Sequence, residues 1–220
     1  INLTVAGSLL IAVMLAERAK SGELNDRTTF WLWLGFATLQ SFTLYAQAMG
    51  IIVTALFGIW ILVAVFFKLF PLRFLVQALL AFGFYLIISI PAIVPFLSHL
   101  TGTLGDNFWI PEPTFEYIYG QQMGTYDYPI WGKIVVAALL VWGTWSLRKM
   151  PHITLLMLLM VAGLPALVLL ISFFKPIFIG RVVAWGAICA VLVLVAGLVA
   201  IRSAPLRWCC IAAFAVTQVF

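Results

Sequence analysis

Charged residues are scarce in this sequence, and their scarcity excludes an ordinary water-soluble fold. Lys, Arg, Asp and Glu make up 9% of the 220 residues, whereas 65% are hydrophobic and the mean hydropathy is +1.18. A soluble domain is about a quarter charged, and a chain of this size could not bury so much apolar surface in water. The composition therefore predicts an all-α membrane protein, because a spanning helix needs about 20 apolar residues and the chain offers such stretches repeatedly.

Cysteine and histidine are also rare. The three cysteines lie in apolar stretches without a CxxC spacing, and the two histidines stand alone at predicted helix ends. This pattern predicts neither a disulfide framework nor a metal site, and no cofactor is expected, although a divalent metal is left open. The net charge of +5 does not indicate a nucleic-acid partner, because the basic residues lie in short loops and form no groove-reading motif.

Eight apolar stretches predict a polytopic bundle of transmembrane helices that forms a single domain over residues 1–220. The stretches are residues 1–16, 29–47, 50–67, 73–98, 130–147, 152–174, 177–201 and 208–220. The first and last are expected to be truncated, so the chain is expected to be a fragment of a larger protein. Residues 48–50 alone separate the second and third stretches, which predicts a tight helix hairpin. Pro91, Pro95 and Pro165 are expected to kink or locally unwind their helices.

Basic residues are divided unequally between alternate loops. The loops after the first, third, fifth and seventh stretches hold nine of the 12 Lys and Arg residues, and the opposite side holds Lys133, Lys175 and Arg181. Cytoplasmic loops carry the excess of Lys and Arg, so the nine-residue side is predicted to be cytoplasmic. The sequence therefore predicts a multi-pass protein of the cytoplasmic membrane whose partners include the lipid bilayer.

Residues 99–132 form the single long loop, which is predicted to be extracytoplasmic. It holds four of the seven acidic residues, no Lys or Arg, and many aromatic residues. Because Trp and Tyr prefer the membrane interface, we expect this loop to form an ordered cap. The residues assigned to the cap are Trp109, Pro111, Glu112, Glu116 and Asp127. Its acidic side chains could act as a general base or metal ligand, or could be solvated loop charges, and their spacing matches no metal motif.

Two further groups of polar residues call for a partner. Arg181 lies about one turn inside the stretch 177–201, where an Arg is unfavourable both for the helix dipole and in hydrocarbon. A lipid phosphate could offset the positive charge of Arg181 by accepting two hydrogen bonds from the guanidinium group. Lys175 is close enough in sequence to bind the same phosphate. The alternative is that both side chains snorkel to headgroups without a specific ligand.

The second group makes one half of the stretch 29–47 polar and is expected to face protein or a water-filled cavity: Gln40, Ser41, Thr43, Tyr45 and Gln47.

Three segments resemble motifs of one enzyme family. They are residues 43–50 (Thr-Leu-Tyr-Ala-Gln-Ala-Met-Gly), residues 107–114 (Asn-Phe-Trp-Ile-Pro-Glu-Pro-Thr) and residues 175–182 (Lys-Pro-Ile-Phe-Ile-Gly-Arg-Val). In their order and spacing, over nearly the whole chain, they resemble the membrane region of bacterial GT-C glycosyltransferases of the dolichyl-phosphate-mannose-protein mannosyltransferase-like group (glycosyltransferase family 39 and relatives). The chain departs from that pattern at Gln47, where the family often has His, and at Val182, where it usually has Tyr.

The resemblance implies an enzyme that transfers a sugar from a polyprenyl-phosphate donor to an acceptor on the outer face of the cytoplasmic membrane of a bacterium. It implies that Arg181, with Lys175, holds the donor phosphate, and that residues 99–132 cover the site. The family's catalytic Asp lies in a first extracytoplasmic loop that has no counterpart in this sequence, so no general base is expected within the chain. Two other functions use the same features: a transporter or flippase of a lipid-linked substrate, and a non-catalytic membrane subunit.

Overall fold

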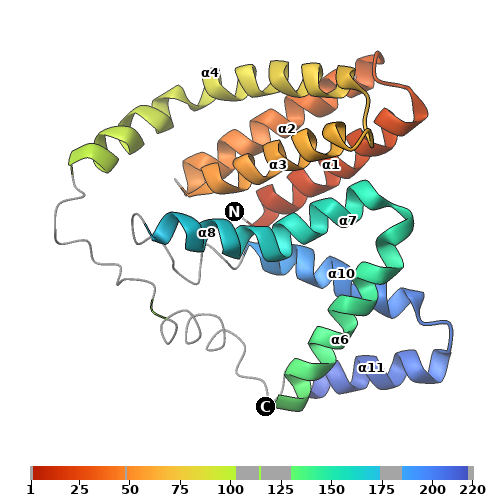
Figure 1. Ribbon diagram of the computed structural model, residues 1–220. Coiled ribbons are helices and arrows are strands. Elements are labelled where there is room, and N and C mark those ends of the chain that lie inside the picture. Colours follow the sequence, from red (N-terminus) through yellow and green to blue (C-terminus); the bar gives the residue numbers. More distant parts are fainter. Residues whose placement is uncertain (1, 48, 103–113, 115–129, 174–184, 218–220) are drawn as a thin grey trace. The chain divides into compact units, whose positions relative to one another are not determined.

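The computed structural model describes residues 2–47, 49–102, 114, 130–173 and 185–217, and this part of the chain is helical between short turns (Figure 1). The helices are α1 (Asn2–Ser21), α2 (Arg27–Ala46), α3 (Gly50–Phe66), α4 (Leu72–Gly102), α6 (Ile130–Ser146), α7 (Pro151–Leu158), α8 (Leu164–Ser172), α10 (Gly186–Ala200) and α11 (Ala204–Thr217). A 3₁₀ turn, η1 (Leu147–Lys149), follows α6, and a π-helical turn, η2 (Leu159–Gly163), joins α7 to α8. The chain divides into two compact units, Ile1–Trp109 and Ile110–Phe220.

The helices fall on the eight apolar stretches predicted from the sequence, with α7, η2 and α8 together forming the sixth. Within the described ranges, three helical segments are long and apolar enough to cross a membrane: Asn2–Ser21, Leu72–Pro95 and Pro151–Ser172. Helices α3 and α10 are apolar but shorter. The all-helical architecture is therefore confirmed and is compatible with a membrane protein, whereas eight crossings remain a prediction. Most of the loop predicted at 99–132 lies outside the described residues, although α4 continues to Gly102.

The prolines affect their helices differently. Helix α4 stays helical through Pro91 and Pro95 and bends along its length (Figure 1). Pro165 lies in the first turn of α8, directly after the π-helical turn η2. Because a proline cannot donate the backbone hydrogen bond and its ring crowds the preceding turn, the wider π turn accommodates it. Local unwinding is thus confirmed at Pro165, whereas α4 remains helical at Pro91 and Pro95.

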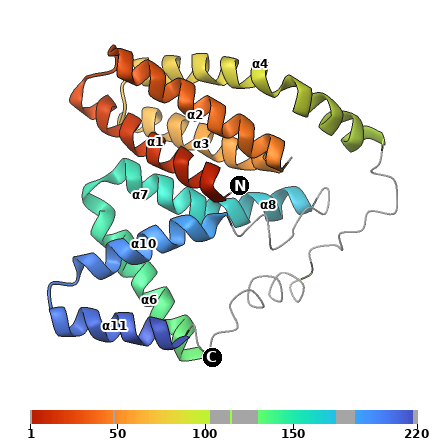
Figure 2. The ribbon, with the colours of Figure 1, turned by 180° about the vertical axis from the view of Figure 1, so that it is seen from behind.

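In the first unit, α2 packs against α1, α3 and α4, and its close contact with α1 can be followed in Figure 2. Aromatic rings from α2, α3, the α3–α4 turn and α4 form the core at one end. Phe36 and Phe57 meet edge to face with their ring centroids 5.0 Å apart, and Trp60 meets Phe70 in the same way at 5.5 Å. Offset and edge-to-face pairs of this kind are favourable beyond the area that they bury. They fix the spacing of the helices that form the candidate site.

In the second unit, α6 and α10 approach closely because each carries a glycine at the contact. A Cβ atom added to Gly143 would collide with the Val193 carbonyl oxygen, and one added to Gly197 would lie 2.8 Å from the Leu139 carbonyl oxygen. Leu139 and Val193 are buried at this contact. Small residues that let helix backbones approach are typical of helix pairs in membranes.

Candidate functional site

Polar side chains of α2 are buried in the first unit, where they meet polar residues of the neighbouring helices. Gln40 and Ser41 are 1% and 2% exposed, and Thr43 is fully buried. Thr54 Oγ1 of α3 donates a hydrogen bond to Gln40 Oε1 (2.8 Å), and Ser89 Oγ of α4 donates one to Ser41 Oγ (3.1 Å). The expectation that these residues face protein is confirmed for Gln40, Ser41 and Thr43.

The remaining members of the polar half of α2 lie nearer its end. Thr43 Oγ1 donates a hydrogen bond to Thr4 Oγ1 of α1 (2.8 Å). Tyr45 is half exposed, but its hydroxyl donates a hydrogen bond to the Ile88 carbonyl oxygen of α4 (2.9 Å). Gln47 caps the helix with extended backbone, and the Gly50 N–H donates to its carbonyl oxygen (2.8 Å). The predicted hairpin between α2 and α3 is confirmed by these contacts.

A groove of ≈ 380 Å³ runs beside this polar cluster, between α3 and α4, with α2 as its floor. We call it the α3–α4 groove. Several of its lining residues are small and leave space between the helices, and these are Ala37, Ala55, Gly58, Ala78 and Ala81. Gly58 shows the free space directly, because a Cβ atom added there would meet nothing within 4 Å. Ligand sites of proteins occupy roughly 300–1,000 Å³, so the groove falls within that range.

Three polar side chains among the described residues line the α3–α4 groove near one end: Gln40, Thr54 and Tyr85. The Gln40 Nε2 atom is buried and makes no hydrogen bond among the described residues. The Tyr85 hydroxyl lies beside Thr54 and Ser89, yet it forms no hydrogen bond of standard geometry in this part of the chain, although Tyr85 is only 3% exposed. A buried donor left unpaired costs about 1–3 kcal/mol. Two such donors at one end of an apolar groove therefore mark a place where a ligand oxygen would be stabilised.

None of the described residues that line the α3–α4 groove is charged. The arrangement suits a long apolar chain with an oxygen near one end, because the apolar lining favours hydrocarbon and the two free donors favour an acceptor. Among the described lining residues, the hydroxyl groups are those of Thr54 and Tyr85, and none carries a carboxylate that could act as a general base. The chemistry available in this groove is binding and orientation.

A separate polar network joins α1 to α2 at the opposite end of the unit. Arg18 Nη1 donates a hydrogen bond to Asp26 Oδ2 (2.9 Å) and lies 3.6 Å from Glu23 Oε2. The hydrogen bond from Arg18, followed by one from Thr28, holds the pKa of the Asp26 carboxyl below its ordinary value. The same end carries Lys20 and Lys68, which line one shallow pocket, as expected for loops predicted to lie on the same side.

The site residues predicted from the sequence lie outside the described residues. They are Arg181, Lys175, Trp109, Pro111, Glu112, Glu116 and Asp127. The phosphate site and the cap therefore remain predictions.

Tyr85 and Thr54 are polar residues of the candidate site that sequence reasoning missed. The available signal was a pair of polar residues one helical turn apart, Tyr85 and Ser89, in an otherwise apolar helix. No family model matches this chain, and no curated protein and no solved structure matches it either.

Proposed function

We propose that this chain is part of a membrane glycosyltransferase that takes a sugar from a polyprenyl-phosphate donor. The observation that carries the proposal is the α3–α4 groove, which is apolar along its length and has unpaired hydrogen-bond donors at one end. The donor has the same form, a hydrocarbon chain that ends in oxygen atoms. The groove also lies against the helix that leads into the first family-like segment, residues 43–50. Eight membrane crossings and the cytoplasmic membrane of a bacterium as location belong to the same proposal.

The dimensions of the groove fit a lipid chain. Its lining runs along α3 from Ile51 to Leu62, a length of about 17 Å at 1.5 Å per residue. Thr54, at the polar end, lies four residues after the start of α3 at Gly50, at a depth of about 6 Å. The interfacial layer of a bilayer is roughly 5–7 Å thick on each side. If α3 begins at the membrane surface, as the proposed topology requires, the polar end matches the depth where a lipid chain joins its headgroup.

Gln40 and Tyr85 would donate hydrogen bonds to the first oxygen of the bound donor. Binding would remove the cost of leaving both donors unpaired. The resemblance by itself assigns the charged phosphate oxygens of the donor to Arg181 and Lys175, which lie outside the described residues. In the transfer step the acceptor hydroxyl oxygen attacks the anomeric carbon, and the bond from that carbon to the phosphate oxygen breaks. The hydroxyl proton passes to a general base outside this chain, and polyprenyl phosphate leaves with the bonding electron pair.

A lipid transporter is the second candidate, and the lateral position of the groove favours it. The groove is bordered by residues that are half exposed, including Leu62, Leu79 and Phe82, so a lipid could enter from the bilayer. Transport and transfer differ in one product, because only transfer breaks the bond between the sugar and the phosphate.

The experiment uses membranes that contain the protein and a photoreactive polyprenyl-phosphate sugar. Gly58→Leu places a side chain in the groove and should lower photolabelling by at least about tenfold. Gly83→Leu is the matched control, because a Cβ atom there also meets nothing within 4 Å but the residue does not line the groove. Tyr85→Phe removes one hydroxyl without changing shape. It should weaken labelling about two- to tenfold and should not lower stability, because it also removes a buried donor that is unpaired without the ligand.

Sugar transfer is then measured with a donor labelled in the sugar. Arg181→Ala should reduce transfer at subsaturating donor by about ten- to a hundredfold, and Arg181→Lys should restore part of it because Lys keeps the charge but loses the bidentate fork. Equal labelling of the Gly58→Leu and Gly83→Leu proteins would exclude the groove as the chain site. A protein that binds the probe and moves it across the bilayer without releasing sugar would favour the transporter.

A further inference from the structure

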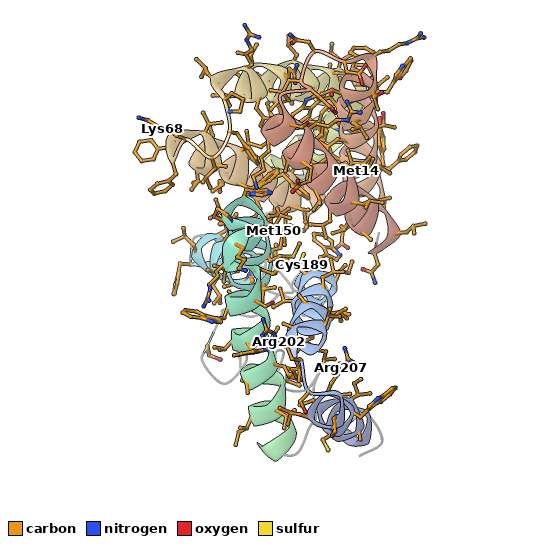
Figure 3. The ribbon with its side chains drawn as sticks, turned by 90° about the vertical axis from the view of Figure 1, so that its right-hand side faces the viewer. Met14, Lys68, Met150, Cys189, Arg202 and Arg207 are labelled. Atoms are coloured by element: carbon orange, nitrogen blue, oxygen red, sulfur yellow. The ribbon has the colours of Figure 1, made fainter. Side chains whose placement is uncertain are left out.

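A second cavity, of ≈ 940 Å³, lies in the second unit, where the end of α6, the turn η1 and the α10–α11 turn meet. Three basic residues line it: Arg148 and Lys149 of η1, and Arg202 of the α10–α11 turn. Arg202 is labelled in Figure 3, together with Arg207 of α11, which does not line the cavity. We call this the basic cavity. Residues from two turns far apart in the sequence thus surround one space.

The positive charges of the basic cavity have no acidic counterpart nearby in the sequence. Residues 128–220 contain seven Lys and Arg residues and no Asp or Glu. The ion pairs of Arg18 with Glu23 and Asp26 lie in the other unit. Like charges around one cavity repel each other unless an anion lies between them. The basic cavity therefore favours an anionic ligand.

The remaining lining distinguishes a lipid from a free anion. Arg148 Cζ lies 4.1 Å from the centroid of the Trp145 ring, a cation–π contact that restrains the guanidinium. The lining extends along α6 from Ser146 to the apolar residue Val135, a distance of about 17 Å. A cavity that is basic and aromatic at one end and apolar over the rest matches a headgroup with its hydrocarbon chain. Trp and Arg together are typical of the membrane interface.

We infer that the basic cavity binds an anionic phospholipid, with its phosphate between Arg148, Lys149 and Arg202 and an acyl chain along α6. This site involves neither the α3–α4 groove nor the sugar donor, so it can be present or absent independently of the proposed transferase activity. Arg148 and Arg202 bind phosphate oxygens through charge-assisted hydrogen bonds. The lipid would hold the ends of α6 and α10 together by bridging the two turns.

The test measures quenching of tryptophan fluorescence by lipids with brominated chains, in the purified chain reconstituted into phosphatidylcholine bilayers. Brominated phosphatidylglycerol is compared with brominated phosphatidylcholine, and the Trp145→Phe protein identifies the local signal. We expect phosphatidylglycerol to bind preferentially. Arg202→Gln should reduce this preference by at least about tenfold, the value of one charge-assisted hydrogen bond. Arg202→Lys should retain part of the preference.

Arg207→Gln is the matched control, because it removes the same charge from the next helix without touching the cavity. It should reduce the preference by no more than about fivefold, the general effect of one surface charge. Equal losses in the Arg202→Gln and Arg207→Gln proteins would overturn the inference in favour of unspecific surface attraction. Displacement of phosphatidylglycerol by inorganic phosphate at the same concentration would overturn it in favour of a free-anion site.

Discussion

The close contact between α6 and α10 provides the sharpest test of the fold, through the substitution Gly143→Ala. The added Cβ atom would collide with the Val193 carbonyl oxygen. The obstacle is backbone rather than a side chain, so no change of rotamer can relieve the collision and the two helices must separate. Separation of the helices would also open the contact at Gly197, where an added Cβ atom would lie 3.1 Å from Gly143 Cα.

The magnitude follows from the kind of collision. Extra atoms in a well-packed contact cost about 1–3 kcal/mol, and a backbone obstacle places this substitution at the upper end. A loss of about 3 kcal/mol would lower the melting temperature of a chain of this size by about 6–12 °C. Thermal unfolding of the detergent-solubilised protein, followed by circular dichroism, measures the shift.

Gly58→Ala is the control for Gly143→Ala. A Cβ atom at Gly58 meets nothing within 4 Å, so this variant should keep its stability or gain about 0.5–1 kcal/mol from the better helix propensity of Ala. The reasoning would be refuted if the Gly143→Ala protein melted at the same temperature as the Gly58→Ala protein.

Three further predictions concern the first unit and the topology. Arg18 holds the folded pKa of Asp26 below its unfolded value, so the stabilisation by this carboxylate is present above about pH 4 and is lost as the pH falls further. The melting temperature of the wild-type protein should therefore fall below about pH 4, and the part of this fall that comes from Asp26 should be absent in the Asp26→Asn protein. Trp33 Nε1 donates a hydrogen bond to Gln77 Oε1 (3.1 Å), and Gln77 Nε2 donates one to the Leu24 carbonyl oxygen (2.7 Å). Gln77→Leu should therefore lower the free energy of unfolding, measured with a chemical denaturant, by about 1–3 kcal/mol. An unchanged stability would mean that water replaces both hydrogen bonds. Single cysteines at Ser21, Thr103 and Ser203, in a protein without its native cysteines, should react with an impermeant thiol reagent in intact cells at Thr103 alone; the reverse pattern would invert the predicted orientation.

The positions of the helices could be predicted from the sequence because helix formation in an apolar stretch is a local property. Each stretch of apolar residues must pair its backbone groups internally once water is excluded, and the helices accordingly follow the predicted stretches closely. The burial of Gln40, Ser41 and Thr43 was predictable for the same reason, since polar side chains avoid hydrocarbon. The hairpin at Gly50 followed from the short separation between two stretches.

The partners of these residues were decided only by the tertiary structure. Nothing in the local pattern pairs Gln40 with Thr54 or Ser41 with Ser89, because helices can rotate about their axes and still bury a polar face. The α3–α4 groove likewise depends on which small residues of different helices line one space, here Gly58 on α3 and Ala78 on α4 among others. The sequence contains many Ala and Gly residues, and their spacing within one helix does not reveal what lies opposite.

The basic cavity also depends partly on features that the sequence predicts and partly on the tertiary structure. Counting Lys and Arg predicted that the turns with Arg148 and Arg202 lie on one side of the membrane. The close packing of α6 against α10, which Gly143 and Gly197 permit, then brings the two turns around a single space. The distribution of Lys and Arg along the chain thus predicts the side, whereas the meeting of two helix backbones decides the site, because a cavity is a property of surfaces that only the folded chain brings together.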